Sequence, residues 1–261
     1  MGLAYGTLQS SKKKALMPGR LVSIDVPSIY KVAGQWLALP RPMAWCTPDT
    51  RRALAGIRKE VERRGGRLLL SDLFHDRTAE SGRPSSFGAC SGDGMHEAGR
   101  AFDVDLGALR LPLAEFWALA RGFGVVPIHR TPDPALSEAW HFECRGSHQR
   151  VYDQHASKPA GLFRTPYLAM VASATLAAGL PHDLFIHNAD EARLQSGLIR
   201  LGHDIGGIDG LIGFRSMRAL RALALDGLSL EAQLSGVEWW LRGMYPAEYG
   251  DAESMETALA A

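Results

Sequence analysis

Four residues in the middle of the chain are of the types that carry metal-assisted hydrolysis. They are His96, Asp103 and His141, with Glu138 three residues before the last of them. Two histidines and one carboxylate that leave a fourth position open are a recurring ligand set of catalytic zinc sites. The chain has nine histidines and 28 Asp and Glu residues, so a packed or surface role is the alternative for each residue taken singly.

The residues around these candidates favour a site. The run Gly99-Arg100-Ala101 lets the backbone turn closely between the first two candidates, because glycine adopts conformations that other residues avoid. Trp140 and Phe142 flank His141 and provide an apolar wall beside it.

Alternating polarity predicts two strands that carry the candidate ligands. In residues 101–106, apolar residues alternate with two aspartates, which is the pattern of a strand with one buried face. Residues 140–144 predict a second strand with His141 and Glu143 on one side. Asp105 and Glu143 are therefore candidates to orient the ligands, with a solvated acid at a strand edge as the alternative.

Helices and short strands are interleaved in this part of the chain without a βαβ repeat. Apolar spacing predicts a helix from Pro48 to Arg64, ended by Gly65-Gly66. Residues 67–74 predict a buried strand, residues 79–95 a long loop, and residues 112–121 another helix. The pattern predicts an α+β fold, a small antiparallel sheet with flanking helices.

The amino-acid composition of the sequence changes after Arg150. Residues 153–165 are polar with Pro and Gly, an Ala-rich stretch over 167–180 predicts a helix, and amphipathic helices separated by a Gly-rich turn follow. We expect a flexible tail in residues 1–20 and a catalytic domain in residues 21–152. A linker with a helix should follow in residues 153–183, and a three-helix module in residues 184–250.

Composition excludes several classes of protein. With 46% hydrophobic and 22% charged residues among 261, the chain is globular rather than disordered or fibrous. Its net charge of +1 provides no overall field that would draw it onto nucleic acid or anionic lipid. No uncharged stretch reaches the roughly 20 residues of a membrane span, so stable membrane insertion is not expected. The odd set of three cysteines predicts reduced thiols rather than disulfides: Cys46, Cys90 and Cys144.

Two segments resemble the signatures of a zinc peptidase family. Residues 96–105 read H-E-A-G-R-A-F-D-V-D and residues 138–143 read E-A-W-H-F-E. They match H-x-x-G-x-A-x-D and E-x-W-H-x-E, the signatures of the zinc peptidases that include D-alanyl-D-alanine carboxypeptidases and dipeptidases and L-alanyl-D-glutamate endopeptidases. The resemblance covers roughly residues 50–150. It implies a zinc ion held by His96, Asp103 and His141, with Glu138 as general acid and base.

The family pattern also includes a cationic residue and a serine near the ligands. Its arginine follows a strand like residues 70–74, where it stabilises the oxyanion or holds a substrate carboxylate. Here His75 stands at the closest position and Arg77 lies two residues on, and both are candidates because a two-residue shift keeps the same strand face. Where the family usually has a serine, two residues before the first ligand, this chain has Gly94.

A second resemblance lies in the helical module. The residues that carry it are Leu194-Gln195, Leu198, Leu201-Gly202, Gly206 to Gly210, Gly213 and Ser216. They are similar to the three-helix peptidoglycan-binding domain, with the pattern L-Q-x-x-L…G…x-D-G-x-x-G-x-x-T. Ser216 stands where Thr is usual, and Leu223-Ala224 replaces a later Phe-Gln pair. The resemblance implies binding to the bacterial wall.

Together the two resemblances imply a zinc-dependent peptidoglycan peptidase, either a D,D-carboxypeptidase or an endopeptidase. The alternative is a non-catalytic, zinc-containing protein that binds peptidoglycan. The presence of Glu138 counts against that alternative, because a structural zinc site needs no base.

The amino-terminal residues bear on where such an enzyme would be made. The basic run Lys12-Lys13-Lys14 is not followed by the apolar segment of a secretory signal. We therefore expect synthesis in the cytoplasm and action on the wall after delivery by phage lysis or by contact-dependent secretion. An immunity protein is the expected partner in the second case.

Overall fold

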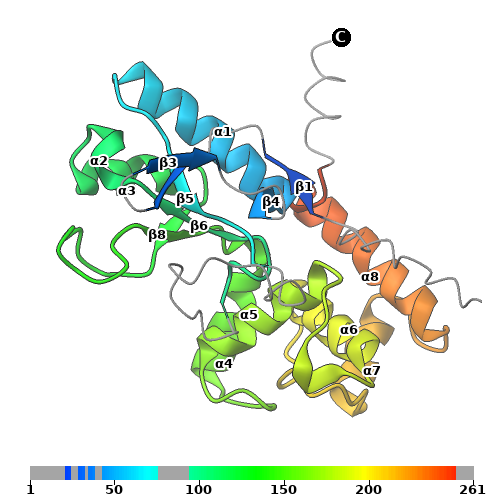
Figure 1. Ribbon diagram of the computed structural model, residues 1–261. Helices are drawn as coiled ribbons and strands as arrows, with labels where there is room; N and C mark the ends of the chain where they lie inside the picture. The colour runs from blue at the N-terminus through cyan, green and yellow to red at the C-terminus, as the bar shows by residue number, and fades with distance from the viewer. Residues whose placement is uncertain (1–20, 25–28, 33–34, 39–42, 76–93, 251–261) are drawn as a thin grey trace, which may run out of the picture.

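The computed structural model describes residues 21–24, 29–32, 35–38, 43–75 and 94–250. It confirms the expected α+β fold class, since helices surround small antiparallel sheets (Figure 1). The expected amino-terminal tail and most of the expected loop at 79–95 lie outside the described residues.

A four-stranded antiparallel sheet forms the centre of the first half of the chain. Its strands lie in the order β5-β6-β8-β7. Their bounds are Leu70–Asp72, Ala101–Val104, His141–Glu143 and Val126–Pro127, in that order. All three strand pairs are antiparallel. One smaller sheet pairs β1 (Val22–Ser23) with β4 (Trp45–Cys46). Another pairs β2 (Ile29–Val32) with β3 (Gln35–Ala38).

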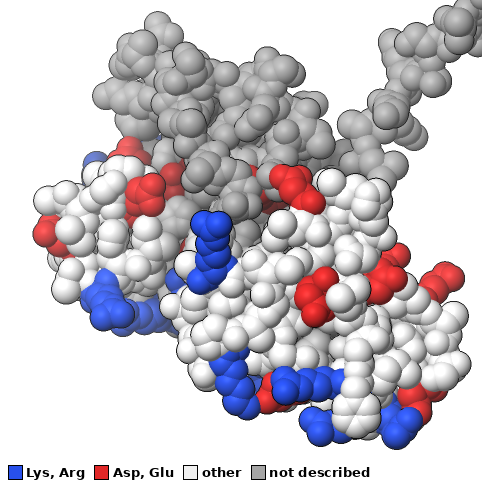
Figure 2. Space-filling model, turned by 90° about the horizontal axis from the view of Figure 1, so that it is seen from below, with Lys and Arg blue, Asp and Glu red and all other residues white. Residues whose placement is uncertain are grey.

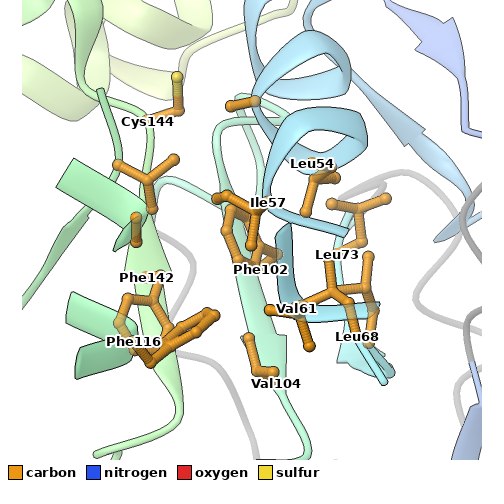
Figure 3. Close-up of a cluster of buried hydrophobic side chains, with 14 of the residues drawn as sticks. Leu54, Ile57, Val61, Leu68, Leu73, Phe102, Val104, Phe116, Phe142 and Cys144 are labelled. Atoms are coloured by element: carbon orange, nitrogen blue, oxygen red, sulfur yellow. The ribbon is translucent and has the colours of Figure 1, made fainter. Parts of the chain in front are cut away.

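Helix α1, Pro48–Arg63, covers one face of this sheet. It begins with proline at its first position and Asp49 in its first turn, both favourable at a helix start. Leu54, Ile57 and Val61 lie on its buried side and pack toward the sheet (Figure 3). The burial of these three side chains is what the helical spacing of the sequence predicted.

Aromatic residues fill the space between the sheet and the helices. Phe102 of β6 and Phe142 of β8 are fully buried, with ring centroids 6.1 Å apart. Phe116 packs edge-on against Phe142, with centroids 4.9 Å apart. Phe116 belongs to α3 (Leu113–Arg121), which follows the short helix α2 (Leu106–Leu109). The core therefore lies on the face of β6 and β8 that carries Phe102 and Phe142.

The second half of the chain is helical. Its α-helices are α4 Gln149–Ser157, α5 Pro166–Ala177, α6 Ala189–Arg200, α7 Phe214–Ala222 and α8 Leu230–Met244. Short 3₁₀ turns lie at Gly146–His148, Asp183–Phe185 and Pro246–Tyr249. Leu194 and Leu198 of α6, Leu220 of α7 and Leu241 of α8 share a second hydrophobic core.

The side chain of Gln195 holds the turn at Asp209, Gly210 and Leu211 against helix α6. Its side-chain oxygen accepts hydrogen bonds from the backbone N–H groups of Asp209 and Gly210, at 2.9 and 2.7 Å. Its amide nitrogen donates to the Asp209 side chain and to the Leu211 carbonyl, at 2.7 and 3.0 Å. Because Gln195 is buried, these bonds satisfy polar groups that would otherwise be costly.

Helix α5 joins the two halves. In Figure 1 it lies between the sheet and helices α6–α8. Met170, Val171 and Ala174 on α5 share a buried cluster with Met95 and Ala98, which flank the first candidate ligand. The helix predicted within the expected linker segment is therefore a packed part of the structure rather than an exposed spacer.

A buried ionic network fixes the 3₁₀ turn Pro246–Tyr249 to both halves. The Glu248 carboxylate accepts a hydrogen bond from Arg200 of α6 at 2.6 Å and lies 3.6 Å from the guanidinium of Arg100, which precedes β6. Arg100 also pairs with Asp49 at 2.9 Å. The Ser147 backbone N–H and hydroxyl both donate to Glu248. Arg100, Arg200 and Glu248 are buried, Asp49 is half-buried, and each charge has a partner, as the low-dielectric interior requires.

The exterior carries charges of both signs. On the face shown in Figure 2, basic and acidic side chains both occur over the helical half. Within the described ranges, no helix has the length and apolar character that crossing a membrane requires.

Removal of the Glu248 carboxylate should destabilise the fold strongly. Glu248→Ala leaves two buried guanidinium groups without a shared counter-charge, and we expect a loss of about 3–5 kcal/mol in the free energy of unfolding. Urea denaturation followed by circular dichroism measures this loss. Glu115→Ala is the control, because Glu115 is exposed and lies 3.7 Å from Arg64, and it should cost less than about 1 kcal/mol. Equal losses in the two variants would contradict the role given to the network.

Candidate metal centre

The register of β6 against β8 brings two of the candidate ligands together. Asp103 pairs directly with His141 across the two strands. Their side chains leave the sheet on the face opposite Phe102 and Phe142, because successive residues of a strand alternate in direction. The Asp103 Oδ1 atom lies 3.1 Å from His141 Nδ1. The two predicted strands therefore present these groups side by side.

His96 reaches the same point from the turn before β6. The Gly99 N–H donates to the His96 carbonyl at 3.0 Å, which closes the turn. Gly99 has φ +66°, and a Cβ there would lie 2.8 Å from the Leu21 side chain. A glycine is thus required on both conformational and steric grounds. His96 Nε2 lies 3.1 Å from His141 Nδ1 and 3.4 Å from Asp103 Oδ1.

The outward nitrogen of each histidine has its own partner. His96 Nδ1 lies 2.6 Å from the Leu73 carbonyl oxygen. A carbonyl only accepts hydrogen bonds, so this nitrogen carries the proton and Nε2 faces the centre. His141 Nε2 lies 3.6 Å from the Glu143 carboxylate, which leaves Nδ1 toward the centre. Outer partners of this kind orient the histidine ligands of metal sites.

Glu143 is itself held in place by two further residues. Its side chain is fully buried, with an exposed fraction of 0%. It accepts hydrogen bonds from the Tyr167 hydroxyl at 2.8 Å and from Arg145 Nε at 2.6 Å. Burial raises the pKa of Glu143, but hydrogen bonding to His141, the charges of Arg145 and His141, and the Tyr167 hydroxyl outweigh burial and hold that pKa below its usual value. Burial and the Glu143 charge raise the pKa of Tyr167. Glu143 therefore lies on the side of His141 that faces away from His96 and Asp103.

The inward atoms of His96, Asp103 and His141 have the spacing of a metal site. Zinc bonds of about 2.0–2.2 Å at tetrahedral angles place ligand atoms about 3.3–3.6 Å apart. The three distances here are 3.1, 3.1 and 3.4 Å. The three residues are also largely buried, with side-chain exposures of 10%, 17% and 12%. The donor set therefore fits a divalent ion with three protein ligands and one position to spare.

Hydrogen bonds within the centre shift the pKa values of His141 and Asp103. Burial lowers the pKa of His141, but hydrogen bonds to Asp103 and Glu143 outweigh burial and raise that pKa to about 9. Burial raises the pKa of Asp103, yet hydrogen bonds from His141 and His96 reverse this and hold it well below its usual range. Asp103 and His141 thus stabilise the charged forms of each other.

A second buried group of possible ligands, Asp72, His75 and His96, adjoins the first. The His75 ring stacks on His96 with centroids 4.7 Å apart and planes 13° apart. His75 Nε2 lies 2.6 Å from Asp72 Oδ2, a hydrogen-bond distance shorter than two ligands of one ion would show. The spacing therefore favours the first group as the metal site, with His75 packed against its ligand His96.

Glu138 and Trp140 lie immediately before β8. Glu138 has φ +59°, a left-handed conformation that is uncommon outside glycine, and its carbonyl accepts a hydrogen bond from His141 N–H at 3.0 Å. Its side chain is exposed. Strained backbone of this kind is concentrated at functional sites. Trp140 is 41% exposed and lies in the turn that precedes β8, outside the strand that the sequence predicted for it.

Other residues singled out in the sequence have different places. Asp105 is the N-cap of α2 and accepts hydrogen bonds from the N–H groups of Gly107 and Ala108 at 2.9 and 3.2 Å. The predicted strand therefore ends at Val104, two residues earlier than alternation indicated. Arg77 lies outside the described residues, so the structure does not choose between it and His75.

The cysteines do not contribute to the centre as the structure describes it. Cys46 and Cys144 are both buried and free of disulfides, and burial raises the pKa of each thiol. The Cys144 Sγ atom lies 3.6 Å from Asp49, in the ionic network rather than at the histidines. Cys90 lies outside the described residues.

Sequence reasoning missed three residues that shape the centre. Tyr167 comes from α5, and nothing in its local sequence indicates a contact with Glu143. Arg145 follows β8 by two residues, so strand alternation from Glu143 could have pointed to it. Asp72 holds His75, and its position three residues earlier was the only available signal.

Comparison with known proteins adds no relative. The chain matches no protein-family model, no curated protein and no solved structure.

Metal affinity at this centre should depend on pH with a definite sign. Because the pKa of His141 is about 9 in the metal-free protein, a divalent ion must displace a proton below that pH. We expect the apparent zinc affinity to rise about tenfold per pH unit between pH 6.5 and 8.5. Chelator competition at several pH values measures this slope. His187→Asn, at an exposed histidine of another segment, should leave it unchanged, and a flat profile for the unaltered protein would contradict the assignment.

Proposed function

We propose that this protein is a zinc-dependent peptidoglycan peptidase that hydrolyses a peptide bond of the wall stem peptide. The observation that carries the proposal is the group of three inward-facing ligand atoms of His96, Asp103 and His141, 3.1–3.4 Å apart. Glu138, the proposed general acid and base, lies three residues before His141, the last ligand, and its carbonyl accepts a hydrogen bond from the His141 N–H.

The donor set supports a catalytic rather than a structural ion. Structural zinc sites are closed by four protein ligands, most often including cysteine, whereas catalytic sites have three and leave one position to water or substrate. Among the described residues the centre offers two histidines and one aspartate, and the described cysteines lie elsewhere. A non-catalytic zinc protein would also have no use for an exposed glutamate in strained backbone three residues before a ligand.

Each residue then has a chemical role. A bound zinc ion would polarise a carbonyl oxygen and lower the pKa of a water molecule to about 7. Glu138 would take the proton of the attacking water and return it to the leaving amine. Glu143 keeps His141 in the tautomer that presents Nδ1, and the Leu73 carbonyl does the same for Nε2 of His96.

The choice of peptidoglycan as substrate rests on two independent parts of the chain. The ligand residues and Glu138 stand in the order and spacing of the peptidase signatures. The helical module has the Gln195-supported Asp-Gly turn of the peptidoglycan-binding pattern. A D,D-carboxypeptidase and an endopeptidase both remain open, with Arg77 or His75 as the group that would meet a substrate carboxylate or oxyanion. Delivery to the wall by phage lysis or by contact-dependent secretion, the latter with an immunity protein as partner, belongs to the same proposal.

Digestion of purified peptidoglycan tests the proposal, with the products identified by mass spectrometry. We expect the zinc-loaded protein to release terminal D-alanine, or to cut within or between stem peptides, and to lose this activity with chelator. Glu138→Gln should lower the rate at least about a hundredfold, because it removes the acid and base, while zinc content stays the same.

Glu115→Gln is the matched control, since it changes an exposed glutamate of α3 outside the centre, and it should retain full activity. A zinc-loaded protein that leaves both the wall and soluble stem peptides uncut would contradict the catalytic proposal and favour a binding protein.

A further inference from the structure

We propose that Tyr167 of α5 is a positioning residue of the metal centre, and that its one hydroxyl group restrains the surroundings of both histidine ligands. Tyr167 lies outside residues 50–150, the segment that resembles the peptidase signatures. It acts through neighbouring groups and is not itself a ligand. This inference rests on the proposed function, because the centre is the site to which that function assigns the zinc ion. It adds that the helical half of the chain sets how tightly the centre holds that ion.

The first contact of the Tyr167 hydroxyl is with the residue that faces His141. The hydroxyl donates a hydrogen bond of 2.8 Å to Glu143 Oε1. The same oxygen lies 3.6 Å from His141 Nε2. Arg145 Nε holds the other oxygen, Oε2, at 2.6 Å. The two donors together fix the plane of the carboxylate, so the oxygen that Glu143 presents to His141 depends on Tyr167.

The second contact of the same hydroxyl lies beside His96. A hydrogen bond from the Met95 backbone N–H to the Tyr167 oxygen opposes the effects of burial and of the Glu143 charge on the pKa of Tyr167. On its other side, the Met95 carbonyl accepts a hydrogen bond from the Arg100 N–H at 2.9 Å. A phenol both donates and accepts hydrogen bonds, so one hydroxyl serves Glu143 and Met95 at once. The backbone that leads into His96 is thereby restrained.

The sequence at the start of α5 places Tyr167 in a restrained turn. Thr165 is the N-cap, and its hydroxyl accepts a hydrogen bond from the Leu168 N–H at 3.2 Å. Pro166 follows at the first helical position, where its fixed φ suits a helix start. The cap and the proline oppose fraying of the first turn, in which Tyr167 lies. The hydroxyl therefore meets the centre from a preorganised backbone.

A buried polar chain fixes α5 to the rest of the helical half. Ser173 Oγ lies 2.6 Å from Ser196 Oγ of α6 and 2.8 Å from His148 Nδ1. All three side chains are buried, where a polar group that loses its partner is costly. Helix α5 is thus held at a defined place between α6 and the residues that follow β8. Tyr167 connects the metal centre to this fixed helix.

Loss of the hydroxyl should reach both histidine ligands. In Tyr167→Phe the ring keeps its packing against the cluster that contains Met95. Glu143 Oε1 loses a donor, however, and the buried Met95 N–H loses an acceptor. The groups that orient His141 and His96 then move more freely, and an ion must order them as it binds.

Zinc binding by the full-length chain tests the inference. Chelator competition at one fixed pH measures the zinc dissociation constant of the unaltered protein and of Tyr167→Phe. Residues that orient metal ligands change metal affinity about ten- to a hundredfold. Because Tyr167 acts one contact further out, we expect Tyr167→Phe to weaken zinc binding about tenfold, the lower end of that range.

Two further measurements separate positioning from a role in folding alone. Cobalt(II) bound in place of zinc has a visible absorption spectrum that depends on the geometry of its ligands, and we expect this spectrum to change in Tyr167→Phe. Urea denaturation of the metal-free protein reports the stability of the fold. A loss of stability in Tyr167→Phe with unchanged zinc affinity and cobalt spectrum would overturn the inference, because the hydroxyl would then serve the fold only.

Tyr152→Phe is the matched control. Tyr152 packs against the same cluster as Tyr167, and its ring centroid lies 5.7 Å from the guanidinium carbon of Arg145. The change removes a tyrosine hydroxyl from the same surroundings but keeps Tyr167, so zinc affinity should stay within about twofold. Equal losses of zinc affinity in the two variants would overturn the inference.

The test distinguishes this inference from the proposed function, because zinc affinity and the cobalt spectrum require no hydrolysis. If Tyr167→Phe weakens zinc binding while the unaltered protein cuts neither wall nor stem peptide, the positioning role stands and the peptidase proposal does not. If the unaltered protein cuts stem peptide while Tyr167→Phe binds zinc as tightly, the peptidase proposal stands and the positioning role does not. An unaltered protein that binds no zinc would contradict both.

Discussion

The cross-strand pair of Asp103 and His141 is the constraint on which the centre depends. A shift of β6 by one residue against β8 would turn one of these side chains to the core face and bring an apolar residue out. The register is held by the buried face, where Phe102 stacks on Phe142 and Phe116 closes the cluster. The hydrophobic core thus positions the polar centre on the opposite side of the same two strands.

The remaining geometry follows from contacts that meet at this pair. His96 is brought in by the turn at Gly99, whose neighbours pack against α5. The same helix supplies Tyr167 to Glu143, so the helical half contributes to the orientation of His141. Arg100, just before β6, is tied through Glu248 to Arg200 of α6. The two expected domains therefore share buried contacts, which fix the helical half relative to the metal centre.

Local patterns predicted much of this arrangement but not its long-range contacts. Alternation located the strands of Asp103 and His141, and helical spacing located α1, because each pattern reflects one buried face. Alternation misplaced Asp105, where a side-chain cap to Gly107 and Ala108 ends the strand. Contacts such as Tyr167 with Glu143 join residues 24 positions apart and have no periodic signature. Only the fold reveals them.

The most direct test of the account is X-ray absorption at the zinc edge of the zinc-loaded protein. The account predicts one zinc ion per chain, surrounded only by nitrogen and oxygen atoms at about 2.0–2.2 Å, from His96, His141, Asp103 and a water molecule. A sulfur shell at about 2.3 Å would show that a cysteine holds the ion. That result, or a protein that retains no zinc, would contradict the central claim.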